Sequence, residues 1–376
     1  MTVRVALDVS AVPPRPAGAG MYTISLARHL ARRTGVELHL LARRTDERWT
    51  MLAPGAAVHA VAPDGRPARL AWEQVRTARL VRSLAPDVYH GPHYTLPVRS
   101  RVRSVVTVHD LTFFDHPEWH ERAKVVYFRA MIKAAVARAD AVVCVSDHTA
   151  SRLRVHAHPR GELVVIPHGV DHDRFSPDGD ESTDLRALAR HGISPPFVAF
   201  VGTIEPRKDV PTLVRAFARI APDHPDMQLV VAGGDGWGTI DARDAVAVSG
   251  VATRIVRPGY VPDGVVAAMY RRARLVVYPS LEEGFGLPAL EALACGAPLV
   301  STRGSAIEEV VGDAAVLVAP GDADALAHAL RQLLGDDRER ERLRAAGPVR
   351  AAAFTWDRSV AQHVSLYERV ARRVVT

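Results

Sequence analysis

The chain has 376 residues, 48% hydrophobic and 24% charged, which is the composition of a globular protein too long for one typical core. We therefore expect two domains. No apolar run reaches about 18 residues, and the first residues lack the pattern of a secretory signal, which argues against a spanning helix and a leader. The two cysteines, Cys144 and Cys295, lie far apart in apolar stretches, which indicates reduced thiols and a cytoplasmic protein.

The first half of the chain alternates between short apolar runs and helical patterns. The pattern predicts helices at 19–33 and 124–139. Runs rich in β-branched residues predict strands at 3–8, 36–41, 87–90, 104–109, 140–146 and 162–167. Such alternation is typical of a parallel sheet with helices on both faces.

The same alternation restarts after residues 171–196, which are rich in proline, glycine and acids and read as a linker with a short helix. A last helix is predicted at 355–376. Strands are predicted at 197–203, 227–234, 254–259, 274–280, 298–302 and 315–320. The sequence thus predicts two doubly wound α/β domains, with a deep cleft between them and ligands outside the carboxyl ends of the strands.

Residues 201–217, VGTIEPRKDVPTLVRAF, run from a strand through a basic turn into a helix. The adjacent cations Arg207 and Lys208 could neutralise a diphosphate through charge-assisted hydrogen bonds. A basic surface turn is an equally good interpretation of these two residues alone. Lys208 is one of only three lysines in the chain, which favours a function.

Residues 282–296, EEGFGLPALEALACG, combine glycines, a helix start and two carboxylates. Gly284 and Gly286 allow close approach of a ligand, and Pro288 suits a first helical turn whose N–H groups can take anionic oxygens. Glu291 could simply complement the helix dipole. That explanation does not cover Glu283, which precedes the glycines and could accept hydrogen bonds from sugar hydroxyls.

Three further features follow strands of the first half. Gly18 and Gly20 precede a helix, but Thr23 stands where a dinucleotide fingerprint needs its third glycine, so a nicotinamide enzyme is not expected. His109 ends a buried strand, where it could act in catalysis or simply pack. His90 and His93 lack a third ligand, so no metal site is expected.

Basic residues are concentrated near the start of the chain, with 16 arginines against 8 acids in residues 1–110 and more cations in the helix 122–139. A basic amphipathic helix can lie on a membrane, although a solvated helix face explains it as well. Nucleic acid is not expected as a partner, because no aromatic platform accompanies the charge.

Together these motifs resemble the retaining glycosyltransferases of family 4, which have the GT-B fold and belong to the glycogen-synthase-like superfamily. The resemblance covers essentially the whole chain. It implies an N-terminal acceptor-binding Rossmann-like domain at 1–172, a linker at 173–196, a nucleotide-sugar-binding Rossmann-like domain at 197–354 and a helix at 355–376 that crosses back to the first domain. The motifs that carry it are VGTIEPRK, RPGYVPDGVVAAMYRRARLVVYPS, EGFGLPALE, VVIPHGVD and TWDRSVAQHVSLYERV.

The resemblance also implies residue roles. Glu283 would contact the donor sugar, His109 would touch that sugar from the acceptor side, and Gly18 and Gly20 would line the cleft. Donor binding would fall to Gly202, Arg207, Lys208, Val261, Gly284, Phe285, Gly286, Leu287 and Glu291, with the last on the ribose. The chain departs from the family pattern at Thr203, where arginine is common, and at His168, where asparagine is common.

The reaction implied is transfer of a hexose, such as mannose or a deoxysugar, from a nucleotide-diphosphate sugar to an acceptor hydroxyl with retention of configuration. No cofactor and no divalent metal are expected, and the acceptor would be a glycan, a lipid-linked sugar or a small molecule. The resemblance places the enzyme in a bacterial cytoplasm, with the inner face of the plasma membrane as an alternative. A non-catalytic nucleotide-sugar-binding protein and a GT-B phosphorylase or epimerase are the rival functions.

Overall fold

The structure of the chain is a computed structural model that describes residues 2–236 and 238–372. The chain divides into two compact units. Unit 1 comprises residues 1–169 and 356–376, and unit 2 comprises residues 170–355. No helix among the described residues combines the length and the apolar character needed to cross a membrane.

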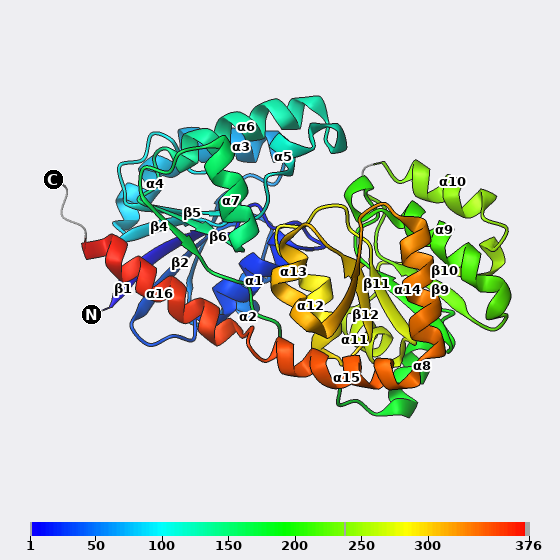
Figure 1. Ribbon diagram of the computed structural model, residues 1–376. Coiled ribbons are helices and arrows are strands. Elements are labelled where there is room, and N and C mark those ends of the chain that lie inside the picture. The colour runs from blue at the N-terminus through cyan, green and yellow to red at the C-terminus, as the bar shows by residue number, and fades with distance from the viewer. Residues whose placement is uncertain (1, 237, 373–376) are drawn as a thin grey trace. The chain divides into compact units, whose positions relative to one another are not determined.

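Unit 1 contains a fully parallel sheet of seven strands in the order β3-β2-β1-β4-β5-β6-β7 (Figure 1). Its strands are β1 (Val3–Asp8), β2 (Val36–Arg43), β3 (Ala57–Ala62), β4 (Val88–Gly91), β5 (Ser104–Val108), β6 (Ala141–Cys144) and β7 (Glu162–Val165). Its helices are α1 (Ala19–Leu30), α2 (Trp49–Leu52), α3 (Arg66–Val75), α4 (Thr77–Leu84), α5 (Thr112–Asp115), α6 (Arg122–Val136), α7 (Asp147–His156) and α16 (Trp356–Arg372).

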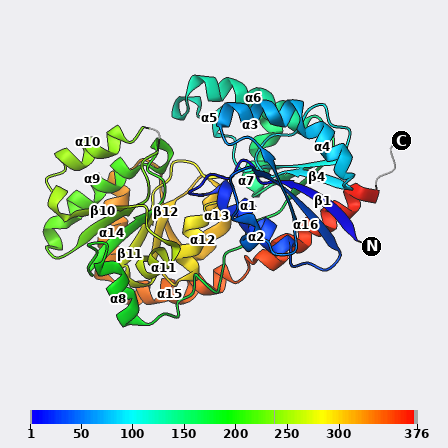
Figure 2. The same ribbon diagram turned by 180° about the vertical axis from the view of Figure 1, so that it is seen from behind.

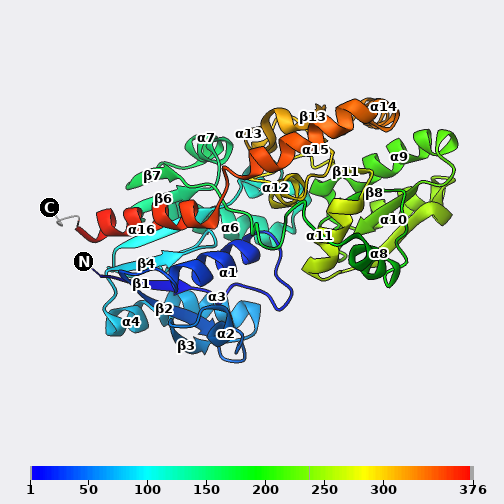
Figure 3. The ribbon, with the colours of Figure 1, turned by 90° about the horizontal axis from the view of Figure 1, so that it is seen from below.

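Helices cover both faces of the unit 1 sheet, because its strands are apolar on both sides. One buried cluster joins the sheet to α1, α2 and α16, and contains Tyr22, Leu26 and Tyr367. The other joins it to α3, α4, α6 and α7, and contains Trp72 and Phe128. Figure 2 shows α3, α4 and α6 on the side opposite to α1, α2 and α16, and Figure 3 shows α16 alongside α1.

Unit 2 contains a parallel sheet of six strands in the order β10-β9-β8-β11-β12-β13. The strands are β8 (Phe197–Val201), β9 (Gln228–Ala232), β10 (Ile255–Gly259), β11 (Leu275–Tyr278), β12 (Leu299–Thr302) and β13 (Ala315–Val318). The helices are α8 (Glu181–Ala189), α9 (Val210–Ile220), α10 (Ile240–Val248), α11 (Asp263–Arg272), α12 (Leu287–Ala294), α13 (Ala306–Val311), α14 (Ala323–Gly335) and α15 (Asp337–Ala351). Single 3-10 turns are η1 (Pro117–Trp119) in unit 1 and, in unit 2, η2 (Pro206–Lys208), η3 (Ala221–Asp223), η4 (Ala252–Arg254) and η5 (Gly312–Ala314).

Packing in unit 2 follows the same plan. Helix α9 contacts α14, while α11 contacts α8 and α12 contacts α15. Asp184 on α8 accepts hydrogen bonds from Arg271 at 2.6 Å and Arg272 at 2.9 Å on α11. The segment expected to be a linker is therefore fastened to unit 2 by buried ion pairs.

The predicted fold class, two Rossmann-like parallel sheets with helices, is confirmed for each unit. Twelve strands lie where the sequence predicts them, with ends shifted by a few residues, and no strand was predicted at 57–62. That segment is the edge strand β3, in which Ala57 and Ala60 are exposed, and its alanines and His59 give little strand signal. The predicted strand at 140–146 is shortened because Ser146 caps α7 by accepting a hydrogen bond from the Thr149 amide.

Candidate active site

The predicted donor residues lie at the point where strand order in unit 2 reverses. From β8 the chain proceeds to β9 on one side, whereas β11 lies on the other side of β8. Arg207 and Lys208 follow β8, and Glu283 follows β11. In open parallel sheets this switch point, at the carboxyl ends of the strands, is where ligands bind.

Four side chains meet at this switch point, and we call Arg207, Lys208, Tyr278 and Glu283 the switch-point cluster. Glu283 pairs through one oxygen with the Arg207 guanidinium at 2.7 Å and through the other with the Lys208 ammonium. The Tyr278 hydroxyl donates to Glu283 at 2.9 Å, and the Lys208 ammonium also contacts that hydroxyl. Arg207 is further held by Glu205 at 2.7 Å and by the Glu282 carbonyl at 3.1 Å.

The switch-point cluster is buried and charged. Lys208 is 7% exposed and Glu283 is 6% exposed. Burial favours the neutral carboxyl, but Arg207 and Lys208 outweigh it and lower the pKa of Glu283 to about 2. Burial and the neighbouring Arg207 lower the pKa of Lys208, while Glu283 acts in the opposite direction. Arg207 and Lys208 thus meet two carboxylates, Glu283 and Glu205, so a further anion can pair with the two cations only by displacing a carboxylate.

Local sequence features place these groups. The turn η2 is followed by Asp209, which adopts the left-handed conformation with φ of 46° and caps α9 by accepting a hydrogen bond from the Thr212 amide. Gly286 adopts φ of 95° at the start of α12, where only glycine is unstrained, and Pro288 occupies the first turn. Two helix N-termini therefore follow the same edge of the sheet.

Close backbone approach at this edge explains two more glycines. A Cβ atom on Gly233 would lie 1.9 Å from the Gly202 carbonyl oxygen, and Gly233 has φ of 140°. The Gly202 amide donates to the Ala232 carbonyl at 2.9 Å. Gly202, predicted as a donor residue, thus sits where the turns after β8 and β9 touch.

The remaining predicted donor residues lie on α12 and near α11. Val261 and Phe285 are buried, Gly284 lies between Glu283 and Phe285, and Leu287 begins α12. Glu291 is half-buried on α12. Burial and the charge of Asp263 raise the pKa of Glu291 to about 8, against smaller opposing effects of Arg174 and Tyr270. Glu291 is therefore mostly protonated at neutral pH in the ligand-free chain.

In unit 1, His109 follows β5 and is 7% exposed. Its Nε2 atom lies 2.8 Å from the Pro92 carbonyl oxygen, and its ring meets Tyr22 edge-on at 5.0 Å. Burial lowers the pKa of His109, so the imidazole is neutral at pH 7. Gly18 precedes α1 with φ of 48°, whereas Gly20, expected before the helix, is the second residue of α1, where a Cβ atom would lie 3.1 Å from Pro16. Gly20 therefore has a packing reason of its own.

His90 and His363 of unit 1 belong to a buried hydrogen-bond network, whereas the buried Nδ1 atom of His93 has no hydrogen-bond partner among the described residues. His90 bonds Tyr367 at 2.7 Å and Thr107 at 2.8 Å, and Tyr22 bonds Thr107 and His363, each at 3.0 Å. His90 thus ties β4 to β5 and α16. Within residues 2–236 and 238–372, no group of three or more His, Cys, Asp or Glu could hold a metal ion.

Both departures from the family pattern lie in packed surroundings. His168 is buried in unit 1, where its ring lies 4.7 Å from Tyr22 and 6.1 Å from Trp356. Thr203 is half-buried in unit 2, next to Gly202. On the basic helix α6, Arg129 donates to the Phe113 carbonyl at 2.7 Å, so part of that helix's charge serves unit 1 internally.

Two groups of candidate residues were missed in the sequence. Tyr278 ends β11, and its hydroxyl at a strand end was the available signal. In unit 1, Asp8 ends β1 and accepts from Tyr89 at 3.0 Å, while Glu73 on α3 pairs with Arg69 at 3.4 Å. Burial and Asp8 raise the pKa of Glu73 to about 7. An acid at the end of the first strand was the signal for Asp8, but nothing marked Glu73.

Comparison with known proteins places the chain in a family. The family model described as Glycosyltransferase Family 4 matches residues 16–174, and the one described as Glycosyl transferases group 1 matches residues 185–350. The O-antigen chain mannosyltransferase B of Escherichia coli is 33% identical over 298 residues, covering 78% of this chain and 77% of that protein. The chain belongs to the family 4 glycosyltransferases.

Solved structures show the same fold. Sucrose-phosphate synthase of Thermosynechococcus elongatus superimposes with a TM-score of 0.80 at 23% identity, covering 98% of this chain and 99% of that one. HepE of Anabaena, in complex with UDP-glucose, gives a TM-score of 0.80 at 17% identity, covering 98% and 100%. At such identities the likeness establishes the GT-B fold alone.

Proposed function

We propose that the protein transfers a hexose, with mannose as the first candidate, from a nucleotide-diphosphate sugar to an acceptor hydroxyl with retention of anomeric configuration. The observation that carries the proposal is the switch-point cluster, in which Arg207 and Lys208 flank Glu283 at the carboxyl edge of the unit 2 sheet. The name of the E. coli relative supports mannose, and the UDP-glucose complex of the Anabaena protein supports a nucleotide sugar as donor.

In this proposal the two cations stabilise the leaving group. The bond between the sugar's anomeric carbon and the diphosphate oxygen breaks, and the bond from the acceptor oxygen forms on the same face. The acceptor proton passes to a phosphate oxygen, so no dedicated protein base takes part. Arg207 and Lys208 bind the developing negative charge where water is excluded, which makes their interactions strong. We assign no divalent metal to the reaction, because these cations supply the positive charge.

Donor binding then exchanges partners within the cluster. Glu283 and Glu205 together balance the charges of Arg207 and Lys208. A diphosphate takes over that role, and the Glu283 carboxylate becomes free to accept hydrogen bonds from sugar hydroxyls. Glu291 on α12, half-buried and with a raised pKa, is assigned to the ribose hydroxyls. Catalysis rests on positioning and electrostatics rather than on a covalent intermediate.

The acceptor is assigned to unit 1. Neutral His109 touches the transferred sugar there, and Gly18 and Gly20 border the acceptor's approach. A glycan, a lipid-linked sugar or a small polyhydroxy molecule suits a carboxyl edge built from hydrogen-bonding groups. We place the reaction in the cytoplasm or at the inner face of the plasma membrane.

A panel of GDP-, UDP- and TDP-sugars tests the proposal. Each sugar is added to the protein with EDTA present, and both the unfolding temperature and the release of nucleoside diphosphate are measured. One donor should raise the unfolding temperature by mass action and also be consumed slowly, with the released sugar first appearing as the donor's anomer by NMR. Binding without any release, also in the presence of oligosaccharide acceptors, would contradict enzymatic transfer. Release that stops with EDTA would contradict metal independence.

A further inference from the structure

A second site lies at the opposite edge of the unit 1 sheet. A cavity of about 470 Å³ opens at the amino ends of the strands, between Ser104 at the start of β5 and Asp140 and Gly161, which directly precede β6 and β7. His109 follows β5 at the carboxyl edge. The cavity is therefore separated from the candidate acceptor side by the length of the strands.

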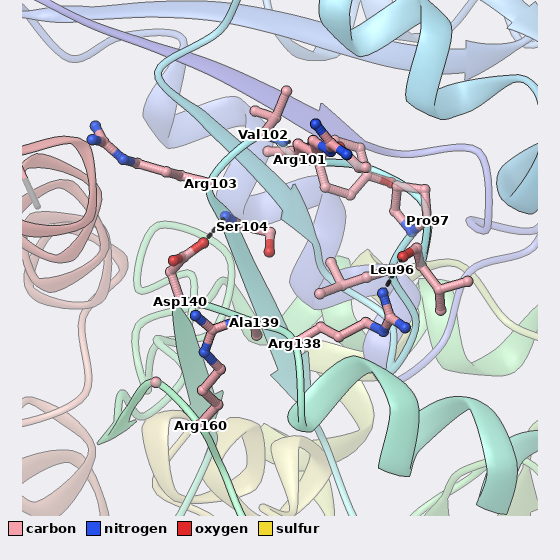
Figure 4. A pocket seen from close by; sticks show the side chains of 14 residues that line it. Leu96, Pro97, Arg101, Val102, Arg103, Ser104, Arg138, Ala139, Asp140 and Arg160 are labelled. Atoms are coloured by element: carbon pink, nitrogen blue, oxygen red, sulfur yellow. Dashed lines mark hydrogen bonds between the residues drawn. The ribbon is translucent and has the colours of Figure 1, made fainter. Parts of the chain in front are cut away.

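Four arginines line this cavity, which we call the amino-edge pocket. Figure 4 shows Arg101 and Arg103 on the loop before β5, Arg138 after α6 and Arg160 before β7. Asp140 is the one carboxylate among the described lining residues, and it accepts a hydrogen bond from the Ser104 amide at 2.8 Å. The pocket therefore carries an excess of positive charge that its own carboxylate does not balance.

The four guanidinium groups are not equivalent. Arg138 donates to the Val98 carbonyl at 2.6 Å, and Arg103 donates to the Ala371 carbonyl of α16, so both have a structural task. Arg101 and Arg160 are exposed and make no side-chain hydrogen bond or ion pair within the described residues 2–236 and 238–372. Two exposed guanidinium groups, from segments about 60 positions apart in the sequence, therefore lie at one cavity and remain available to a ligand.

We propose that the amino-edge pocket binds a phosphate- or diphosphate-bearing ligand, at a site distinct from the sugar-transfer site. Guanidinium groups bind phosphate oxygens through paired N–H donors, and a phosphate or diphosphate has enough oxygens for two arginines, whereas a carboxylate has only two. The volume suits one small phosphorylated molecule or one lipid headgroup, since ligand pockets measure roughly 300–1,000 Å³. It is too small for an extended polyanion.

Isothermal titration with inorganic pyrophosphate tests the proposal on the full chain. The pocket variant R101Q/R160Q removes the two free cations, and R32Q/R154Q is the matched control, because it removes two exposed unit 1 arginines that do not line the pocket. The affinity of one binding event should fall about tenfold or more in the pocket variant and stay unchanged in the control. The variant R207A separates this event from pyrophosphate binding at the switch-point cluster, and should retain it.

Vesicle sedimentation identifies the source of the phosphate. If the ligand is a lipid headgroup, the wild type and the control sediment with phosphatidylcholine vesicles that contain phosphatidylglycerol, whereas the pocket variant does not. If the ligand is a free phosphorylated molecule, pyrophosphate binding depends on the pocket and sedimentation is absent. Equal binding of both probes by the pocket variant and the control would overturn the proposal. Unfolding temperatures without ligand verify that all variants fold.

Discussion

The two sheets share a doubly wound order, yet their carboxyl edges use opposite chemistry. In unit 2, Arg207, Lys208 and Glu283 form buried ion pairs. In unit 1, His90 in β4 and His109 after β5 are neutral, because burial lowers the pKa of each imidazole, while the acid Asp8 at the end of β1 lies at the same edge. The difference matches a division of labour in which one unit holds a charged diphosphate and the other orients a neutral hydroxyl.

The carboxyl edges of the two sheets also differ in how they respond to ligands and to pH. Ion pairs in unit 2 can exchange one anion for another, because the displaced carboxylate can gain hydrogen bonds from sugar hydroxyls. The hydrogen-bond network of unit 1 links β4, β5 and α16 and has no charge to exchange. We therefore expect donor-dependent change in unit 2 and pH-dependent change in unit 1.

The largest expected effect is on catalysis, from K208A. Loss of the ammonium group removes one of two cations that stabilise the leaving diphosphate, so kcat/KM for transfer should fall about 100- to 1,000-fold, the cost of losing one preorganised donor. K124A is the control, since Lys124 pairs with Glu121 away from the switch-point cluster, and should stay within about twofold. Equal activity of K208A and wild type would show that the buried cation of unit 2 does not stabilise the leaving diphosphate, and the proposed division of labour between the units would fail.

Backbone geometry in unit 2 predicts the next effect, on stability. G233A places a Cβ atom 1.9 Å from the Gly202 carbonyl oxygen and forces alanine to φ of 140°. Such a conformation alone costs about 1–3 kcal/mol of unfolding free energy, and the clash adds to it. G234A is the matched control, because a Cβ atom on Gly234 meets nothing within 4 Å. Thermal unfolding should show a drop of several degrees for G233A alone; equal curves would mean that the turns do not meet.

Acidification should weaken unit 1 before unit 2. Burial lowers the pKa of His93 to about 3 and of His363 to about 4, so these residues stabilise the fold fully above their ordinary value near 6.5 and lose that contribution as pH falls. Glu283, with its pKa lowered to about 2, keeps its contribution until pH falls below about 4.5. Hydrogen exchange at pH 7 and pH 5, corrected for intrinsic rates, should show faster opening confined to unit 1.

Two single-histidine variants test this prediction, one at a buried position and one at an exposed position as the control. H363L should flatten the pH dependence of unit 1, whereas H158L, at an exposed position, should leave it unchanged. Opening of unit 2 ahead of unit 1 between pH 7 and pH 5 would reverse the comparison.

The smallest expected effect is from E291Q. The pKa of Glu291 is raised to about 8, so the folded state favours its protonated form, and the wild type loses stability as pH rises from about 4.5 through 8. Glutamine mimics the neutral carboxyl and removes that loss. The unfolding temperature of E291Q relative to wild type should rise by a few degrees between pH 5 and pH 9. A difference that is constant with pH would show that Glu291 has an ordinary pKa.

Much of the fold was readable in the sequence, because apolar runs with turn residues define buried parallel strands. The strands at 3–8, 197–201 and 299–302 illustrate this. The edge strand β3 at 57–62 was not readable, since only Ala62 of its six residues is buried and alanine carries little strand signal. The segment 173–196 was predicted to be a linker. Its Asp184 pairs with Arg271 and Arg272 on α11, which lie far away in the sequence, so local patterns could not reveal that the segment is fastened to unit 2.

The candidate site was readable only in part. Sequence motifs indicated Arg207, Lys208 and Glu283 separately, and the parallel topology explains why they meet, since β8 and β11 are neighbours. That the carboxylate pairs with both cations could not be inferred from a pattern that assigned it to sugar hydroxyls. Glu73 was invisible because it lies on a helix, where nothing distinguishes a buried carboxylate from an exposed one. The roles given to the predicted donor residues remain predictions.

Hydrogen exchange of the full chain with a saturating nucleoside diphosphate tests the central claim most directly. If the switch-point cluster holds the diphosphate, exchange should slow at residues 202–209 and 283–291 of unit 2, while the strand ends near His109 in unit 1 stay unchanged. Protection confined to unit 1, or protection in unit 2 that K208A leaves intact, would contradict the account.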